Sequence, residues 1–153
     1  MLNKIRAFFD TEFATPEDTP WTADQQQLAT AALLIEVAKM DQHFDATEVE
    51  TLKQILLKKF ELQPTQLQEL IQLAEEEQDQ ASSLYQFTQL INQHCSAETK
   101  YQLIVNMWQV AFADGVIDKY EEYIIRRVAD LIYVAHGDFI RAKIAARDQE
   151  LNH

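Results

Sequence analysis

The stretch VAFADGVIDKYEEYIIRRVADL, which runs from Val110 to Leu131, joins an apolar run to a second run with helical spacing through a short polar turn. Three carboxylates, Asp114, Asp118 and Glu121, fall within eight positions of the turn. An Asp-Gly pair is a turn signal. The apolar residues that follow recur every three or four positions, as on one face of a helix. The stretch therefore predicts two helices joined by an acidic hinge.

The same pattern occurs 73 positions upstream, in VAKMDQHFDATEVETLKQIL, residues 37–56. Both segments have the spacing D-x-x-x-D-x-x-E, with Asp41, Asp45 and Glu48 as the earlier carboxylates. Apolar residues continue to match beyond the hinge: Leu52 with Ile125, Ile55 with Val128, and Phe60 with Tyr133. We interpret this match as a duplicated helix–turn–helix unit, which predicts a bundle with approximate two-fold symmetry.

The rest of the chain has the composition of a helical protein. Gly occurs twice and Pro three times in 153 residues, so many short strands with tight turns are disfavoured. Apolar spacing predicts four helices with approximate bounds, 23–40, 46–60, 119–134 and 138–144. It also predicts a helix that starts at Pro64, one that includes residues 84–91, and one that follows Ser96. The expected fold class is all-α, a compact bundle of seven to eight helices.

Three polar residues are expected to mark helix starts. Thr22 with Gln25 forms the capping-box pattern, and Ser96 is a suitable N-cap. Asp138, just after Gly137, is expected to cap the last helix.

The N-terminal segment, residues 1–22, is expected to be an amphipathic helix followed by a linker, with residues 23–153 as the helical domain. Leu2, Ile5, Phe8 and Phe9 share one face at helical spacing. That helix would dock on the domain, or residues 1–13 would contact a membrane periphery or a partner. No signal peptide or apolar run of membrane-spanning length is visible, and a cytoplasmic location is expected.

The net charge of −12 disfavours contacts with a nucleic-acid backbone and favours divalent cations or a basic partner. A lone cysteine, Cys95, cannot form an internal disulfide, which fits a reducing compartment. It adjoins His94, but adjacent helix residues point to different faces. No arrangement of nucleophile and base stands out, so the chain is not expected to be an enzyme.

The hinge carboxylates have two readings. Asp45 with Glu48, and Asp118 with Glu121, fit the D-x-x-E capping box, which needs no ligand. Capping does not account for Asp41 and Asp114, because a carboxylate at the end of a helix meets the helix dipole unfavourably. A hard cation with oxygen ligands, Ca²⁺ or Mg²⁺, would relieve the repulsion. Nearby cations would be the alternative: Lys39, Lys119, Arg126 and Arg127.

Neither hinge has the calcium-loop spacing of an EF-hand. Counting from Asp41, the third position is His43, the glycine position is Ala46 and the twelfth is Leu52. Any cation site would therefore be of another type.

The segments LLIEVAKMDQHFDATEVETLKQIL and VAFADGVIDKYEEYIIRRVADLIYV resemble the two signature segments of the TerB-like family of tellurite-resistance proteins. The same domain resembles the N-terminal region of DjlA-type co-chaperones. The resemblance implies an all-helical domain linked to bacterial stress response, with metal-binding acidic residues. Those residues would be Asp114, Asp118, Glu121, Asp41, Asp45 and Glu48. Glu36 matches a further family glutamate, but the position 73 residues later is Gln109.

The leading hypothesis is a non-enzymatic stress-response module in which a divalent cation at the hinges sets the geometry that a protein partner binds. The alternative is an acidic interaction domain or co-chaperone-like adaptor without metal. The sequence identifies neither the partner nor the oligomeric state. No J domain or His-Pro-Asp triplet is present.

Overall fold

The structure, a computed structural model, describes residues 11, 13, 21–39, 46–60, 62–76, 80–113 and 119–151. These residues contain seven helices and no strand: α2 (Ala23–Lys39), α3 (Ala46–Lys59), α4 (Pro64–Glu76), α5 (Gln80–His94), α6 (Ala97–Ala113), α7 (Lys119–Leu131) and α8 (His136–Leu151). The all-α prediction is confirmed. The N-terminal helix predicted over residues 2–9 lies outside the described residues.

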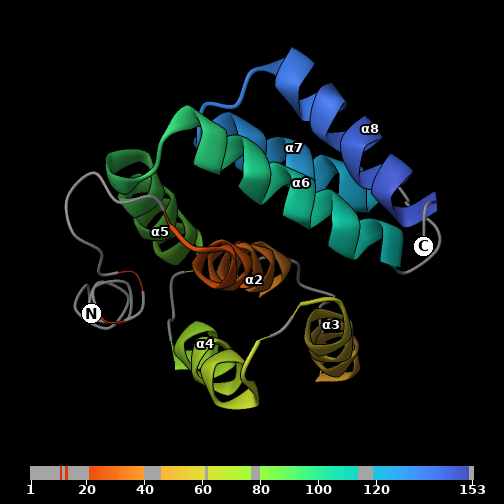
Figure 1. Cartoon of the computed structure of the whole chain (residues 1–153). Coiled ribbons are helices and arrows are strands. Elements are labelled where there is room, and N and C mark those ends of the chain that lie inside the picture. The colour runs from red at the N-terminus through yellow and green to blue at the C-terminus, as the bar shows by residue number, and fades with distance from the viewer. Residues whose placement is uncertain are drawn as a thin grey trace.

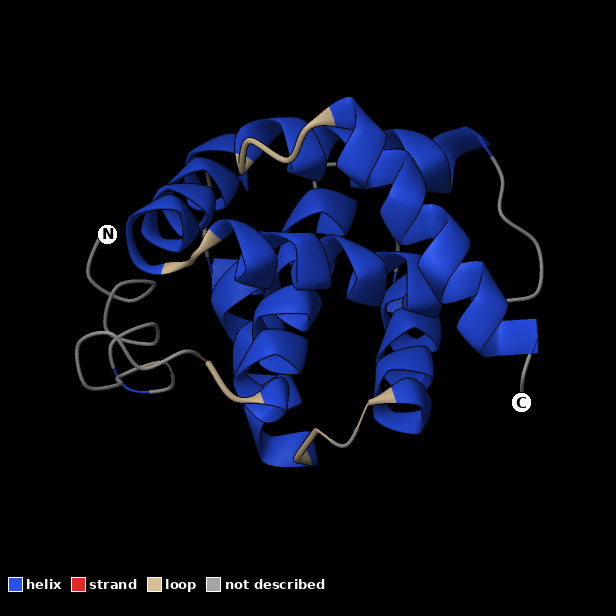
Figure 2. Ribbon diagram, turned by 45° about the horizontal axis from the view of Figure 1, so that its top comes forward, coloured by secondary structure: helices blue, strands red, loops and turns tan. Residues whose placement is uncertain are grey.

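Helix α2 lies at the centre of the bundle (Figure 1). Helices α6, α7 and α8 form a group on one side of α2, and α3 and α4 lie on the other side, while α5 joins the two groups (Figures 1 and 2). The most extensive contact between two helices is that of α6 with α8. Helix α2 packs against α4, α5 and α6.

The core is apolar and centres on α2 and α6. Leu33 and Trp108 have no exposed surface. The Trp108 ring packs against Phe139 of α8, with ring centroids 5.3 Å apart, and against Phe112 at 6.1 Å. Both helices have apolar residues nearly all round, as expected for helices with neighbours on several sides.

The duplication extends to a third helix. Helices α3 and α7 begin 73 positions apart, and α4 and α8 begin 72 positions apart. Over residues 64–73 and 136–145, buried, half-buried and exposed positions coincide at nine of ten. We call α2–α4 the first copy and α6–α8 the second copy. The repeat is therefore a three-helix unit, larger than the helix–turn–helix expected from the sequence.

The predicted match of Phe60 with Tyr133 is wrong. Phe60 is 2% exposed, whereas Tyr133 is 77% exposed. The buried equivalent of Phe60 is Ile132, which is 0% exposed. The reason is that α7 is one residue shorter than α3, so the register of the repeat shifts by one at this point.

Helix α7 ends at Leu131, three residues earlier than predicted. The backbone N–H of Val134 donates to the carbonyl of Ala129 at 2.8 Å, and that of Tyr133 donates to the carbonyl of Asp130 at 3.3 Å. These two bonds form a Schellman motif, which needs a left-handed residue and usually uses Gly. Tyr133 takes that role with a φ of 62°. The side chain of Asn92 also donates to the Leu131 carbonyl at 3.1 Å.

Helix α8 begins at His136, so the prediction that Asp138 caps it is wrong. The Phe139 N–H donates to the carbonyl of Ala135 at 2.9 Å, which places the start before Asp138. Asp138 lies in the first turn and pairs with Arg141 at 3.1 Å. The helix also continues to Leu151, beyond the predicted end at residue 144.

Two predicted helix starts are confirmed at the level of hydrogen bonds. Gln25 N–H donates to Thr22 Oγ1 at 3.1 Å, and Thr22 N–H donates to Gln25 Oε1 at 2.9 Å, which completes a capping box. Thr99 N–H donates to Ser96 Oγ at 3.2 Å. Pro64 is the first residue of α4, as expected.

Two residues from the segment before α2 belong to the same core. Phe13 is 4% exposed and Trp21 is 7% exposed. Their rings pack at 4.6 Å, and Phe13 also contacts Phe87 of α5 at 6.3 Å. These contacts attach Phe13 and Trp21 to the helical domain.

Candidate cation site at the helix hinges

Each copy places its carboxylates around the hinge between its first and second helices. Helix α3 begins at Ala46, so Asp45 immediately precedes it and Glu48 is its third residue. These are the N-cap and N3 positions of a capping box. Asp41 and Asp45 lie outside the described residues, as does the side chain of Glu48.

The second hinge has the same layout. Helix α7 begins at Lys119, which puts Asp118 immediately before it and Glu121 at its third residue. Asp114 and Asp118 lie outside the described residues, as does the side chain of Glu121. The hinge carboxylates therefore remain predictions, and only their positions relative to the described helices are fixed.

The arginines proposed to balance the second hinge lie well along α7. Arg126 follows Asp118 by eight residues, a distance of about 12 Å along a helix axis. Its guanidinium lies over the Phe139 ring, 5.7 Å from the centroid, and Arg127 is exposed. Exposed charges farther apart than about 8 Å are largely screened at physiological salt. The Arg126 guanidinium is thus engaged with a core ring of α8, and the charge balance at the hinge stays a prediction.

The first hinge has an additional carboxylate nearby. Glu36, in the last turn of α2, is 6% exposed and is the one buried charged residue in the described part of the chain. A negative charge close to a helix C-terminus meets the helix dipole unfavourably. The corresponding position in the second copy is Gln109, whose side-chain amide donates to Gln149 of α8. The two hinges therefore differ in charge one turn before the acidic motif.

A buried polar chain connects the two helices that lead into the hinges. Gln102 donates to Asn106 Oδ1 at 3.0 Å, and Asn106 donates to Thr30 Oγ1 at 3.3 Å. The Thr30 hydroxyl donates to the Gln26 carbonyl at 2.8 Å. This link was not predicted from the sequence, although Asn106, a polar residue within the apolar run of α6, was a visible signal. The link fixes α2 against α6.

The two hinges also share a helix contact. Helix α3, which follows the first hinge, packs against α6, which precedes the second hinge. A change in the angle of α3 would therefore act on α6 directly.

In the described ranges, no group of three or more His, Cys, Asp or Glu side chains is placed to hold a metal ion. Burial raises the pKa of the Cys95 thiol from 9.0 to about 12, and the nearby Lys100 opposes this only in part. The thiol is therefore protonated at neutral pH and is a poor nucleophile or metal ligand. Among the residues with described positions, no helix has the length and apolar character needed to span a bilayer.

The family model for tellurite resistance protein TerB matches residues 27–144. The match covers most of the chain, including both hinges, all of α3, α4, α6 and α7, and more than half of α2 and of α8, and the chain belongs to this family. No curated protein and no solved structure matches the chain significantly.

Proposed function

We propose that the chain is a non-enzymatic module of the tellurite-resistance type that binds a divalent cation through hinge carboxylates. The observation that carries the proposal is the repetition of one carboxylate pattern around the same structural feature. In both copies the pattern begins close to the end of one helix and continues into the first turn of the next. Oxygen donors of this kind suit Ca²⁺ or Mg²⁺. The ligands would be Asp114, Asp118 and Glu121, with Asp41, Asp45 and Glu48 in the first copy.

The expected role of the cation is to set the angle between the helices at each hinge. Binding would neutralise the repulsion among three carboxylates and fix α3 relative to α2, and α7 relative to α6. Since α3 packs on α6, a change at one hinge reaches the other. A protein partner in a cytoplasmic stress response would then recognise the angle between the hinge helices, and this angle would depend on the bound cation.

The alternative is an interaction domain or co-chaperone-like adaptor that needs no metal. The Thr22–Gln25 capping box is a specific observation in its favour, because it is complete without any ion. Asp45 with Glu48, and Asp118 with Glu121, have the same spacing. In that case the acidic surface itself would bind a basic partner.

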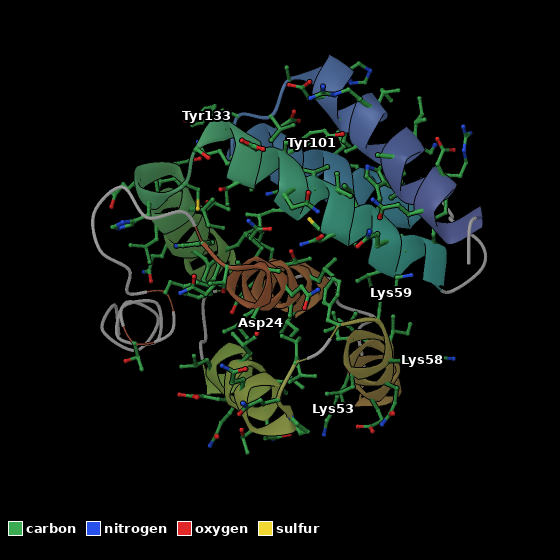
Figure 3. The ribbon with its side chains drawn as sticks, in the orientation of Figure 1. Asp24, Lys53, Lys58, Lys59, Tyr101 and Tyr133 are labelled. Carbon is green, nitrogen blue, oxygen red and sulfur yellow. The ribbon has the colours of Figure 1, made fainter. Side chains whose placement is uncertain are left out.

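Calorimetric titration of metal-stripped protein with Ca²⁺ and Mg²⁺ separates the two functions. We expect saturable binding that is lost in the Asp114→Asn/Asp118→Asn variant. Asp24→Asn is the matched control, because Asp24, labelled in Figure 3, is exposed in the first turn of α2, at the end of that helix opposite the first hinge. An absence of binding heat for both ions in folded protein would favour the metal-free adaptor.

A further inference from the structure

The outward side of α7 and α8 carries large apolar side chains. Tyr123 is 58% exposed, Ile140 is 37% exposed and Ile144 is 43% exposed. Ile140 and Ile144 are four residues apart on α8, so they are neighbours on one helix face. We define the α7–α8 outer face by its exposed residues Tyr123, Arg126, Arg127, Asp130, Ile140, Ile144, Arg147 and Asp148.

The first copy has polar residues at the same positions. Ile140 and Ile144 are the fifth and ninth residues of α8, and the fifth and ninth residues of α4 are Gln68 and Gln72. Both glutamines are exposed. The same fold therefore forms with polar side chains at these positions, and packing within the unit does not explain the isoleucines.

The same contrast occurs on the second helix of each copy. Tyr123 is the fifth residue of α7, and the exposed Glu50 is the fifth residue of α3. At three equivalent positions, the second copy thus replaces an exposed polar residue with an exposed apolar one. Single exposed apolar residues such as Tyr85 are common on protein surfaces. Three of them on neighbouring helices, each in place of a polar residue of the first copy, suggest an interface.

Helices α7 and α8 form one continuous surface here. Lys143 Nζ lies 3.2 Å from Glu122 Oε1, which joins α8 to α7. Arg126 lies over the Phe139 ring, 5.7 Å from its centroid, one turn farther along α7.

The charge of this region differs from that of the rest of the chain. Residues 119–148 contain six basic and five acidic residues, a net charge of +1, whereas the whole chain has −12. The remaining residues therefore sum to −13. Two copies of the chain repel each other through most of their surface, and this repulsion is smallest where the α7–α8 outer faces meet.

We propose that the α7–α8 outer face is a self-association interface between two copies of this chain, related by a two-fold axis. Its arginines, Arg126, Arg127 and Arg147, lie among the exposed acidic residues Asp130 and Asp148. A face of mixed sign and near-zero net charge complements itself better than it complements a strongly acidic or strongly basic partner.

The size of the face sets the expected strength of the dimer. A helix of 16 residues is about 24 Å long, and two adjacent helices are about 20 Å wide. The face therefore offers about 500 Å² per copy, or about 1,000 Å² in total, at the lower limit for a specific interface. We expect a weak dimer with a dissociation constant in the micromolar range.

Sedimentation equilibrium of the full chain tests the interface, over roughly 1 to 200 μM protein, a range that brackets micromolar constants. The wild-type chain should pass from monomer to dimer over this range. Ile140→Gln/Ile144→Gln introduces the residues of the first copy and should weaken association about tenfold or more. Tyr85→Gln is the matched control, because Tyr85 is 59% exposed on α5, outside the face, and its substitution should leave association unchanged.

The dependence on salt tests the symmetry. Salt screens the repulsion between two chains of charge −12, so added NaCl should tighten a two-fold dimer. A head-to-tail contact between a basic and an acidic face would weaken instead, which would overturn the two-fold arrangement. A chain that stays monomeric throughout, or a dimer that the double variant leaves intact, would overturn the interface itself. Circular dichroism verifies that both variants are folded.

Discussion

The two copies have the same order of helices, but their helices pack against different partners. In the second copy, α8 packs along α6, and α7 contacts both of them. In the first copy, α4 packs on α2, whereas α3 makes its main contact with α6 of the other copy. Trp108 and Phe139, with ring centroids 5.3 Å apart, join the helices of the second copy. Duplication thus preserved the order of the helices, whereas the packing partners of the helices differ between the copies.

The largest expected effect is on the free energy of unfolding. It tests whether a core side chain of the second copy contributes more to stability than its equivalent in the first copy. Phe139 and Leu67 are the fourth residues of α8 and α4, and they are 1% and 0% exposed. We expect Phe139→Ala to lower the free energy of unfolding by about 3–5 kcal/mol, because it removes the ring that packs on Trp108. Leu67→Ala should cost about 2–3 kcal/mol, near the lower end for such changes.

Urea denaturation followed by circular dichroism measures both losses. If Leu67→Ala lowers the free energy of unfolding by as much as Phe139→Ala or more, the second copy does not have the more stabilising core.

The next effect concerns the buried link between the copies. Asn106 is 5% exposed and connects Gln102 to the Thr30 hydroxyl on α2. We expect Asn106→Ala to cost about 1–3 kcal/mol, because buried polar groups lose their partner. Thermal unfolding measures the loss. Gln54→Ala, an exposed control on α3, should change stability by less than about 0.5 kcal/mol. Equal losses in the two variants would show that the link does not hold the copies together.

A smaller effect arises at Cys95, the residue that follows α5, the helix that joins the copies. The Cys95 thiol has its pKa raised to about 12 by burial, so it stays protonated in the folded chain after it ionises in the unfolded chain. Stability should therefore be complete below about pH 9 and fall between pH 9 and 12, by about 1 kcal/mol at pH 10. Cys95→Ala should remove this part of the alkaline loss. Identical pH profiles for the two proteins would contradict the prediction.

The smallest effect lies at the end of α7. Tyr133, labelled in Figure 3, has a φ of 62° and is exposed. Lys100 Nζ lies 5.9 Å from the centroid of its ring. Tyr133→Gly should raise the free energy of unfolding by about 0.5 kcal/mol, because Gly adopts this conformation without strain. Phe60→Gly, at the end of α3, should instead destabilise by several kcal/mol, since Phe60 is buried. A destabilised Tyr133→Gly variant would show that the ring has a structural role.

The sequence was sufficient for the elements that depend on local chemistry. The capping box at Thr22, the N-cap at Ser96 and the start of α4 at Pro64 follow from side chains that act on their own helix. The end of α7 could not be predicted, because it uses a left-handed tyrosine where Gly is usual. The start of α8 at His136 was missed because Asp138 carries a capping signal but pairs with Arg141 instead.

For the site, the position of the acidic motif relative to the helices could be predicted from the sequence, but its buried surroundings could not. The spacing placed Asp45 and Asp118 directly before helices, and α3 and α7 begin where that spacing requires. The buried Glu36 and the Thr30–Asn106 bond depend on how α2 meets its neighbours, which periodicity does not encode. A shift of one residue in the repeat also misaligned Phe60, because apolar matching alone does not distinguish Ile132 from Tyr133.

Amide hydrogen exchange with and without Ca²⁺ shows whether a cation acts at the hinges. Exchange should slow in the first turns of α3 and α7, residues 46–49 and 119–122, because the ion fixes the start of each helix. Asp45→Asn should remove the effect at α3, and Asp118→Asn should remove it at α7. Exchange that Ca²⁺ leaves unchanged in both turns of the folded protein would contradict the account.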